Sequence, residues 1–340
     1  MVVGETDVTR PIAMYTGQWA DMPLETLLRR MHEWGFDGVE LAIAGDHFDV
    51  VKALEDDSYI PAKQALLAKY GLKCYAFTAH LVGQCVCDHP LDERHRRIVP
   101  EDIWGDGEPE GVHQRAAERM KMVGRAAAAM GVEVVVGFTG SKIWLTVAGF
   151  PPVPPAMIDD GYRDLAARWN PILDVYDEVG VKFALEVHPS EIAYDFWTAR
   201  RTLEAMAYRP AFGFNLDPSH LYWQLVDPAA FVYEFGDYIY HVHVKDAVRL
   251  LDGRNGILAS HLPFGDHQRG WNFVSPGRGG VDFEKIFRAL NAVGYTGPLS
   301  VEWEDNGMDR EQGAPEAVAL IRRLDLSPSV VRFDAAYEEA

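Results

Sequence analysis

The chain has 340 residues, of which 48% are hydrophobic and 24% are charged, a composition typical of a globular protein with a large core. Its 32 lysine and arginine residues stand against 51 aspartate and glutamate residues, so the net charge is −19. A chain this acidic repels phosphate backbones and anionic membranes, and we therefore expect no nucleic-acid and no membrane partner.

Targeting and redox motifs are not evident. The N-terminus lacks a basic start followed by an apolar run, and the apolar stretch 126–138 is too short to span a bilayer. Cys74, Cys85 and Cys87 leave an odd thiol and a single C-x-C, which suits neither disulfides nor a structural zinc site. We therefore expect reduced thiols and a cytoplasmic protein.

One unit recurs along the chain: an amphipathic helix, a glycine stop, and a short apolar run that ends in polar residues. The apolar runs cover residues 11–16, 38–42, 73–79, 133–138, 182–187, 211–216, 238–244 and 298–302. The helices between them cover residues 23–34, 62–70, 112–130, 162–178, 198–207, 228–235 and 283–293. Glycine directly after a helix favours its termination, because glycine adopts positive φ without penalty. Near-continuous apolar runs are typical of strands buried on both faces, as in a parallel sheet.

Eight strands alternating with helices predict a single-domain (β/α)8 TIM barrel over residues 1–326, followed by a tail over 327–340 that serves as a strap or an oligomer contact. An open doubly wound sheet is the alternative, but no G-x-G-x-x-G motif follows an early strand. Three long segments, 82–110, 140–160 and 249–280, each follow a strand. In a barrel, such segments lie on the face where active sites form, and we expect them to act as lids.

Polar side chains gather where the last four strands end. The sequence reads LEVH at 185–188, NLDPSH at 215–220, YHVHVKD at 240–246 and VEWED at 301–305. Because side chains alternate along a strand, Glu186 and His188 share a face, as do His241, His243 and Lys245. Carboxylates crowded at a barrel mouth repel each other unless a cation neutralises them, so the pattern indicates a divalent-cation site with mixed oxygen and nitrogen ligands. The alternative for each residue taken singly is a satisfied strand-end side chain.

These motifs carry a family resemblance. EVHP at 186–189, NLDPSH at 215–220, HVHVKD at 241–246 and SVEWED at 300–305 resemble the sugar phosphate isomerase/epimerase family, xylose-isomerase-like TIM barrels related to ketose 3-epimerases and inosose dehydratases. The resemblance extends from the first strand to Arg323. It implies one divalent metal, expected to be Mn²⁺ with Co²⁺, Mg²⁺ or Zn²⁺ as alternatives, held by Glu186, Asp217, His243 and Glu302.

The resemblance also implies a reaction: proton abstraction next to the carbonyl of a keto sugar, through a metal-stabilised enediolate. Glu186 and Glu302 resemble the paired carboxylates that exchange protons across the substrate in epimerases. His243 is preferred to His241 as a ligand because it lies two residues nearer the rim.

Five further residues are candidates for the chemistry. We expect His188 and Lys245 to act in general acid–base catalysis, and His80, His220 and Arg278 to bind substrate. Three of them have a structural alternative, in which His220 only orients a metal ligand, Lys245 only pairs with Asp246, and Arg278 only braces its loop.

Other functions stay open at this point. The stretch 260–280 together with EVHPSEIAYDFW at 186–197 is similar to a larger subgroup that includes the α subunits of C-glycoside deglycosidases. A lyase that cleaves 3-oxo-glycosides by elimination, assisted by a small β subunit, is therefore the alternative to an isomerase or epimerase. A non-catalytic metal-binding barrel is a third hypothesis, and a trinuclear zinc endonuclease is disfavoured by the charge of −19. We expect an oligomer in carbohydrate metabolism with a small carbohydrate or glycoside as substrate.

Overall fold

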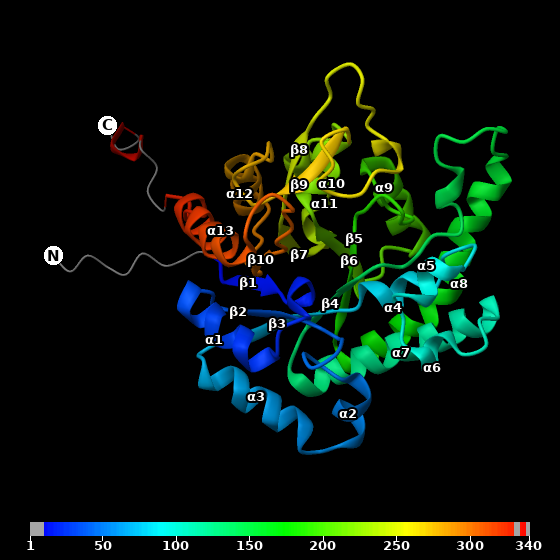
Figure 1. Cartoon of the computed structure of the whole chain (residues 1–340), viewed down its shortest axis with the longest axis horizontal. Helices are drawn as coiled ribbons and strands as arrows, with labels where there is room; N and C mark the ends of the chain where they lie inside the picture. Colours follow the sequence, from blue (N-terminus) through cyan, green and yellow to red (C-terminus); the bar gives the residue numbers. More distant parts are fainter. Residues whose placement is uncertain (1–9, 330–333, 338–340) are drawn as a thin grey trace.

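The computed structural model describes residues 10–329 and 334–337. Eight parallel strands close into a barrel in the order β1-β10-β7-β6-β5-β4-β3-β2 (Figure 1). They are β1 (Ile12–Tyr15), β2 (Gly38–Ala42), β3 (Lys73–Thr78), β4 (Val134–Gly137), β5 (Lys182–Glu186), β6 (Phe212–Leu216), β7 (Ile239–Val244) and β10 (Leu299–Val301). Each lies within one of the predicted apolar runs, and the predicted (β/α)8 TIM barrel is confirmed.

A layer of helices surrounds the barrel, one after each strand. These helices are α1 (Leu24–Trp34), α3 (Tyr59–Lys69), α7 (Pro109–Met130), α8 (Pro155–Val179), α9 (Phe196–Ala205), α11 (Pro228–Phe235), α12 (Phe283–Ala292) and α13 (Arg310–Leu324). Gly35, Gly131 and Gly180 take φ values of 84°, 79° and 72° directly after α1, α7 and α8, as the glycine pattern predicts. The sequence pattern does not predict α13, because Gly313 and Pro315 interrupt its periodicity.

The core lies between the barrel wall and the inner faces of the helices. Trp169 of α8, for example, is fully buried against Phe183 of β5, with ring centroids 4.3 Å apart. Inside the barrel, the small side chains of Ala76, Val136 and Ala184 pack together. Glu186 lies two residues beyond Ala184 on β5 and therefore takes the same inward face. Polar side chains thus begin where the small apolar cluster ends.

The long segments at the carboxyl ends of the strands have structure of their own. The first holds α4 (His80–Gln84), α5 (Glu93–Arg96) and α6 (Glu101–Trp104), the second holds η2 (Trp144–Thr146), and the third holds η4 (Ala259–His261). Shorter connections hold η1 (Gly17–Trp19), α2 (Val50–Glu55), α10 (Pro218–Trp223) and η3 (Gly236–Tyr238). The third segment is built on an antiparallel pair, β8 (Asp246–Arg249) and β9 (Trp271–Val274), drawn in yellow and orange in Figure 1.

The first and last parts of the barrel are joined by a buried ion pair. Arg10, only 1% exposed, pairs with Asp325 just after α13 and donates from Nε to the Tyr295 carbonyl at 2.9 Å. The predicted tail 327–340, which includes η5 (Ala335–Tyr337), lies partly outside the described residues, and its role as a strap or an oligomer contact stays a prediction.

No helix of the described residues combines the length and the apolarity needed to cross a membrane. Cys74, Cys85 and Cys87 are all free, with the last two buried.

Candidate metal centre and active site

The carboxyl ends of β5, β6, β7 and β10 bring the four predicted metal ligands together. Glu186 ends β5, Asp217 follows β6, His243 lies near the end of β7 and Glu302 follows β10. One ligand atom of each lies within 4.8 Å of the others, and all four side chains are buried. Parallel strands of a closed barrel all end at one rim, which explains why ligands spread over more than 100 residues of chain converge.

Imidazole nitrogens and carboxylate oxygens alternate through this cluster. Nδ1 of His243 lies 2.9 Å from Oε2 of Glu302 and 3.3 Å from Oε2 of Glu186. Nε2 of His220 lies 3.2 Å from both Oε1 of Glu186 and Oδ2 of Asp217. His220 therefore contacts two of the predicted ligands, as a residue that orients metal ligands would.

Several buried atoms of the cluster have no hydrogen-bond partner within the described residues. They are Oε2 of Glu302, Oδ2 of Asp217, Oδ1 of Asn215 and both ring nitrogens of His220. A buried polar atom without a partner costs about 1–3 kcal/mol. The unpartnered oxygens of Glu302 and Asp217, beside Glu186 and His243, form a mixed oxygen and nitrogen donor set that suits a divalent ion such as Mn²⁺, Co²⁺ or Zn²⁺. The residues present therefore fit the metal that the motifs predict.

Glu40 of β2 supports the centre from inside the barrel. Nε2 of His243 donates to it at 3.1 Å, Nε2 of His241 at 2.8 Å and Oγ of Ser300 at 2.6 Å, and Thr78 also donates. Burial raises the pKa of Glu40, but the two imidazoles outweigh burial and hold the pKa well below its ordinary range. Glu40 is therefore ionised, and it holds His243 with Nδ1 facing the cluster.

Sequence analysis missed Glu40. Its only sign in the sequence is one carboxylate in the apolar run GVELA, where a buried charge is rare unless paired. The partner lies 203 residues away in β7, so no local pattern connects the two.

His80 and His188 flank the cluster, as predicted for rim residues. Nε2 of His80 lies 2.8 Å from Oε2 of Glu186. The ring of His188 packs edge-on against that of His220, with centroids 4.0 Å apart, and its Nδ1 lies 3.2 Å from Oγ of Ser190. Burial and the neighbouring imidazole of His220 hold the pKa of His188 well below its ordinary value, so His188 is neutral.

Lys245 extends from the end of β7 into a ring of carboxylates. Its Nζ lies 3.1 Å from Glu302, 3.3 Å from Glu304 and 3.8 Å from Asp217. Burial lowers the pKa of Lys245, but these carboxylates outweigh it and raise the pKa well above the ordinary value. Lys245 is therefore an ammonium ion, which can donate hydrogen bonds but does not act as a base.

Gln18 and Glu304 are further rim residues that sequence analysis did not single out. Nε2 of Gln18, in η1, donates to Oε1 of Glu302 at 2.9 Å and to Oε1 of Glu304 at 3.1 Å. Nothing in the local sequence GQW marks this glutamine as a site residue. Glu304 lies in the motif VEWED, at the same strand end that led to the prediction of Glu302 as a site residue.

The β8–β9 hairpin covers one side of the cluster with aromatic rings. Phe273 of β9 lies under Lys245, whose Nζ is 4.3 Å from the ring centroid, and edge-on to His220 at 5.4 Å. Trp271 of β9 stacks on Trp223 of α10 at 4.4 Å with the planes 4° apart. The long segment after β7 thus excludes water from the lysine side of the site.

Arg278 does not lie with the other predicted site residues. Its guanidinium is 54% exposed and pairs with Glu316 of α13 at 2.7 Å. The guanidinium therefore points out to the helix layer and not into the barrel mouth. This position agrees with the alternative prediction, in which Arg278 braces its loop.

Known proteins are similar to this chain over most of its length. A family model described as "Xylose isomerase-like TIM barrel" matches residues 28–324. The uncharacterized protein YfiH of Bacillus subtilis (strain 168) is 26% identical over 326 residues, which cover 92% of this chain and 98% of YfiH. Inosose dehydratase of Serratia proteamaculans (strain 568) is 26% identical over 186 residues, which cover 52% of this chain and 60% of that enzyme. This second match thus spans less than two thirds of the relative.

Solved structures show the same fold. The E. coli 3-keto-D-glucoside 4-epimerase YcjR has a TM-score of 0.63 and 17% identity, and the match covers 92% of this chain and 99% of that one. A crystal structure of the IolI protein with a bound zinc atom has a TM-score of 0.63 and 18% identity, with coverage of 93% and 98%. At these identities the likeness is one of fold.

Proposed function

This chain belongs to the xylose isomerase-like TIM barrel family, and from that premise we propose that it is a divalent-metal-dependent isomerase or epimerase of keto sugars. The observation that carries the proposal is the buried set of Glu186, Asp217, His243 and Glu302, whose ligand atoms lie within 4.8 Å of one another. A divalent cation bound there supplies a Lewis acid that polarises a carbonyl and offsets negative charge developing on its oxygen. The fold shared with a 3-keto-D-glucoside 4-epimerase supports a keto sugar as the substrate.

Glu186 and Glu302 are the residues that we propose move the proton. Burial raises the pKa of Glu186, but His80 and His220 outweigh burial and keep its pKa well below the ordinary value. It is therefore a carboxylate that can accept a proton from the carbon next to the carbonyl. In an epimerase, Glu302 would have to hold a proton when Glu186 takes one, and would deliver it to the opposite face of the same carbon. In an isomerase, the proton taken by Glu186 would be returned to the neighbouring carbon.

The other rim residues bind and orient the substrate in this proposal. Lys245, as an ammonium ion, donates to a substrate oxygen, and neutral His188 serves as a second acceptor or donor. His80 and His220 contact Glu186 and keep its carboxylate oriented.

Solvent exchange tests the proposal directly. The purified chain, loaded with Mn²⁺, is incubated with D-fructose and with 3-oxo-glucosides in deuterated water and followed by proton NMR. We expect deuterium at the carbon next to the carbonyl, lost in Glu186→Gln. Glu191→Gln is the matched control. Glu191 is also buried, but its side chain accepts from the backbone N–H of Thr139 at 2.8 Å, whereas Glu186 contacts imidazoles. No exchange with any of these compounds would contradict the proposal.

Elimination from a 3-oxo-glycoside is the second candidate. Such a lyase needs the same first proton abstraction and then an acid that protonates the leaving group. Two groups beside the cluster can stay protonated: Lys245, and His220, whose pKa is lowered by burial but raised further by Asp217, to about 9. Release of the aglycone from a 3-oxo-C-glycoside, with and without a small second subunit, separates this reaction from isomerisation.

The metal, the assembly and the compartment belong to the same proposal. We propose Mn²⁺ as the ion, and the zinc in the IolI structure supports a divalent metal in this fold. Metal analysis of the purified protein should find about one divalent ion per chain. We also propose a cytoplasmic oligomer, which light scattering would contradict if the protein scatters with the mass of one chain.

A further inference from the structure

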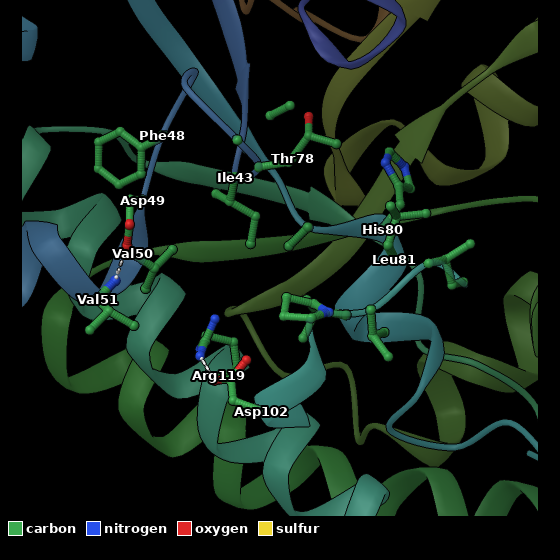
Figure 2. Close-up of a pocket in the computed structure, with 18 of the residues that line it drawn as sticks. Ile43, Phe48, Asp49, Val50, Val51, Thr78, His80, Leu81, Asp102 and Arg119 are labelled. Carbon is green, nitrogen blue, oxygen red and sulfur yellow. Dashed lines mark hydrogen bonds and ion pairs between the residues drawn. The ribbon is translucent and has the colours of Figure 1, made fainter. Parts of the chain in front are cut away.

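A second hollow lies beside the metal cluster, over the carboxyl ends of β1, β2 and β3. It is a cavity of about 560 Å³, within the range of small-molecule binding sites. Tyr15, Thr78 and His80 line it from the strand ends, and the segments 42–51 and 97–102 line it from outside. Figure 2 shows His80 and Leu81 at one end of this hollow.

The inner end of the cavity borders the metal centre through two shared side chains. His80 lines the cavity and at the same time places Nε2 2.8 Å from Oε2 of Glu186. Tyr15 also lines it, and its ring stacks on His243, with centroids 6.2 Å apart and planes 16° apart. A molecule that spans both regions would therefore pass these two side chains.

The cavity has a mixed lining in which apolar surface slightly exceeds polar surface; Arg97 is among its polar residues, and several of the others are already engaged. The apolar side chains are Ile43, Phe48, Val51, Leu81, Ile98 and Val99. Asp49 accepts from the backbone of the first residues of α2, Asp102 pairs with Arg119, and Thr78 donates to Glu40. A free sugar, which carries hydroxyls on every side, would replace only part of its hydrogen bonds to water in such a cavity, whereas an apolar group would be covered by the aliphatic and aromatic side chains.

Two aliphatic side chains at this cavity are unusually exposed. Leu81 is 46% exposed and Ile98 is 37% exposed. Both face a cavity that an apolar group would fill, and such a group would remove their surfaces from water.

We propose that this cavity binds an apolar substituent of the substrate, such as an aromatic ring, while the sugar ring that carries the substituent lies at the metal centre. The preferred substrate is then a glycoside with an apolar aglycone. This inference rests on the proposed function for the position of the sugar, and on the cavity itself for the position of the aglycone.

Binding of two glucosides to the full chain tests the cavity. Isothermal titration compares 4-nitrophenyl β-D-glucopyranoside with methyl β-D-glucopyranoside, which differ only in the aglycone. We expect the aryl glucoside to bind about tenfold more tightly, because its ring leaves water. Equal affinities, or no measurable binding of the aryl compound at millimolar concentration, would overturn the proposal.

Variants place the preference in the cavity. Leu81→Ser with Ile98→Ser should remove most of the tenfold preference, and both sites are exposed enough that folding is spared. Ala44→Trp, at an exposed position that lines the cavity, should also abolish it by filling the space. Leu251→Ser is the matched control, since this leucine is 48% exposed and lies outside the cavity. If the preference for the aryl glucoside persists in both cavity variants, the cavity is not the aglycone site.

The two proposals fail separately. An aryl preference without any solvent exchange leaves the cavity assigned and removes the proposed reaction. Exchange with D-fructose without an aryl preference leaves the reaction and removes the aglycone site.

Discussion

Glu40 and His243 form a buried pair in which Nε2 of the imidazole lies 3.1 Å from both carboxylate oxygens. The same ring turns Nδ1 toward the cluster, 2.9 Å from Oε2 of Glu302. Because Glu40 is ionised, Nε2 is the ring nitrogen that donates to it, and Nδ1 is the one turned toward the metal ligands. Burial lowers the pKa of His243, but Glu40 and Glu302 outweigh burial and raise it well above its ordinary value, so a metal that binds Nδ1 would displace a proton. Glu40 of β2 thus determines which ring nitrogen of His243, in β7, faces the other metal ligands.

The Glu40→Gln variant should weaken metal binding by about tenfold, because the imidazole loses the charge that orients it and raises its basicity. Titration of the metal-free protein with Mn²⁺ measures this. Glu191→Gln, at a buried carboxylate outside the cluster, should bind Mn²⁺ with the affinity of the unmodified chain. An unchanged affinity in a folded Glu40→Gln protein would show that Glu40 only fills space.

Removal of the metal should lower thermal stability. An ion present at about 100 times its Kd stabilises the native state by about 2.7 kcal/mol, which corresponds to a rise in Tm of about 5 °C in a protein of this size. Thermal scans with chelator and with added Mn²⁺, Co²⁺, Zn²⁺ or Mg²⁺ measure the shift and rank the ions. The shift should vanish in Glu186→Gln and in His243→Ala. A chain whose Tm ignores all four ions does not hold a metal at this site.

Lys245→Met should lower turnover by about 100-fold or more while leaving the metal in place. The ammonium lies 3.1 Å from Glu302 and is the cation best placed to bind a substrate oxygen, but it offers a metal no lone pair. Metal content and turnover are measured on the same sample. Lys285→Met provides the control, because this lysine is half exposed and pairs with Asp227 away from the barrel mouth. Loss of metal together with turnover would show a structural role.

Glu191 should make stability fall as the pH rises. Burial, and then the neighbouring Asp88, raise the pKa of Glu191 from 4.5 to about 8. Between these values the folded state keeps the proton that the unfolded state releases, so unfolding is progressively favoured as pH increases. Glu191→Gln cannot ionise and should gain ~1–3 kcal/mol relative to the unmodified chain between pH 5 and pH 8. Urea unfolding at both pH values checks this, and parallel pH dependences in the two proteins would contradict it.

Arg278→Ala should leave turnover unchanged and alter the free energy of unfolding by less than about 1 kcal/mol. Its guanidinium is half exposed in an ion pair with Glu316, and exposed ion pairs contribute little. Steady-state kinetics and urea unfolding measure the two effects. A large rise in KM in Arg278→Ala would show that Arg278 binds substrate after all.

The residues at the strand ends show which parts of the site could be predicted from the sequence. Polar residues at the ends of apolar runs indicated a divalent-cation site, because parallel strands share one rim, and the family resemblance then implied Glu186, Asp217, His243 and Glu302 as its ligands. Arg278 lies in a loop, where no period determines side-chain direction, and its position was predictable only as one of two alternatives. Gln18 and the helix α13 lacked any local pattern.

The sequence by itself determined the barrel, its strands and the polar residues at the strand ends, because alternation along strands and glycine after helices are local properties of the chain, while the choice of four donors among those residues came from the family resemblance. Only the tertiary structure decided that Glu40 lies under His243 and that a partly apolar cavity lies beside His80. Closure of the barrel brings β2 within hydrogen-bond distance of β7, and contacts between residues so distant in sequence leave no periodic trace in it.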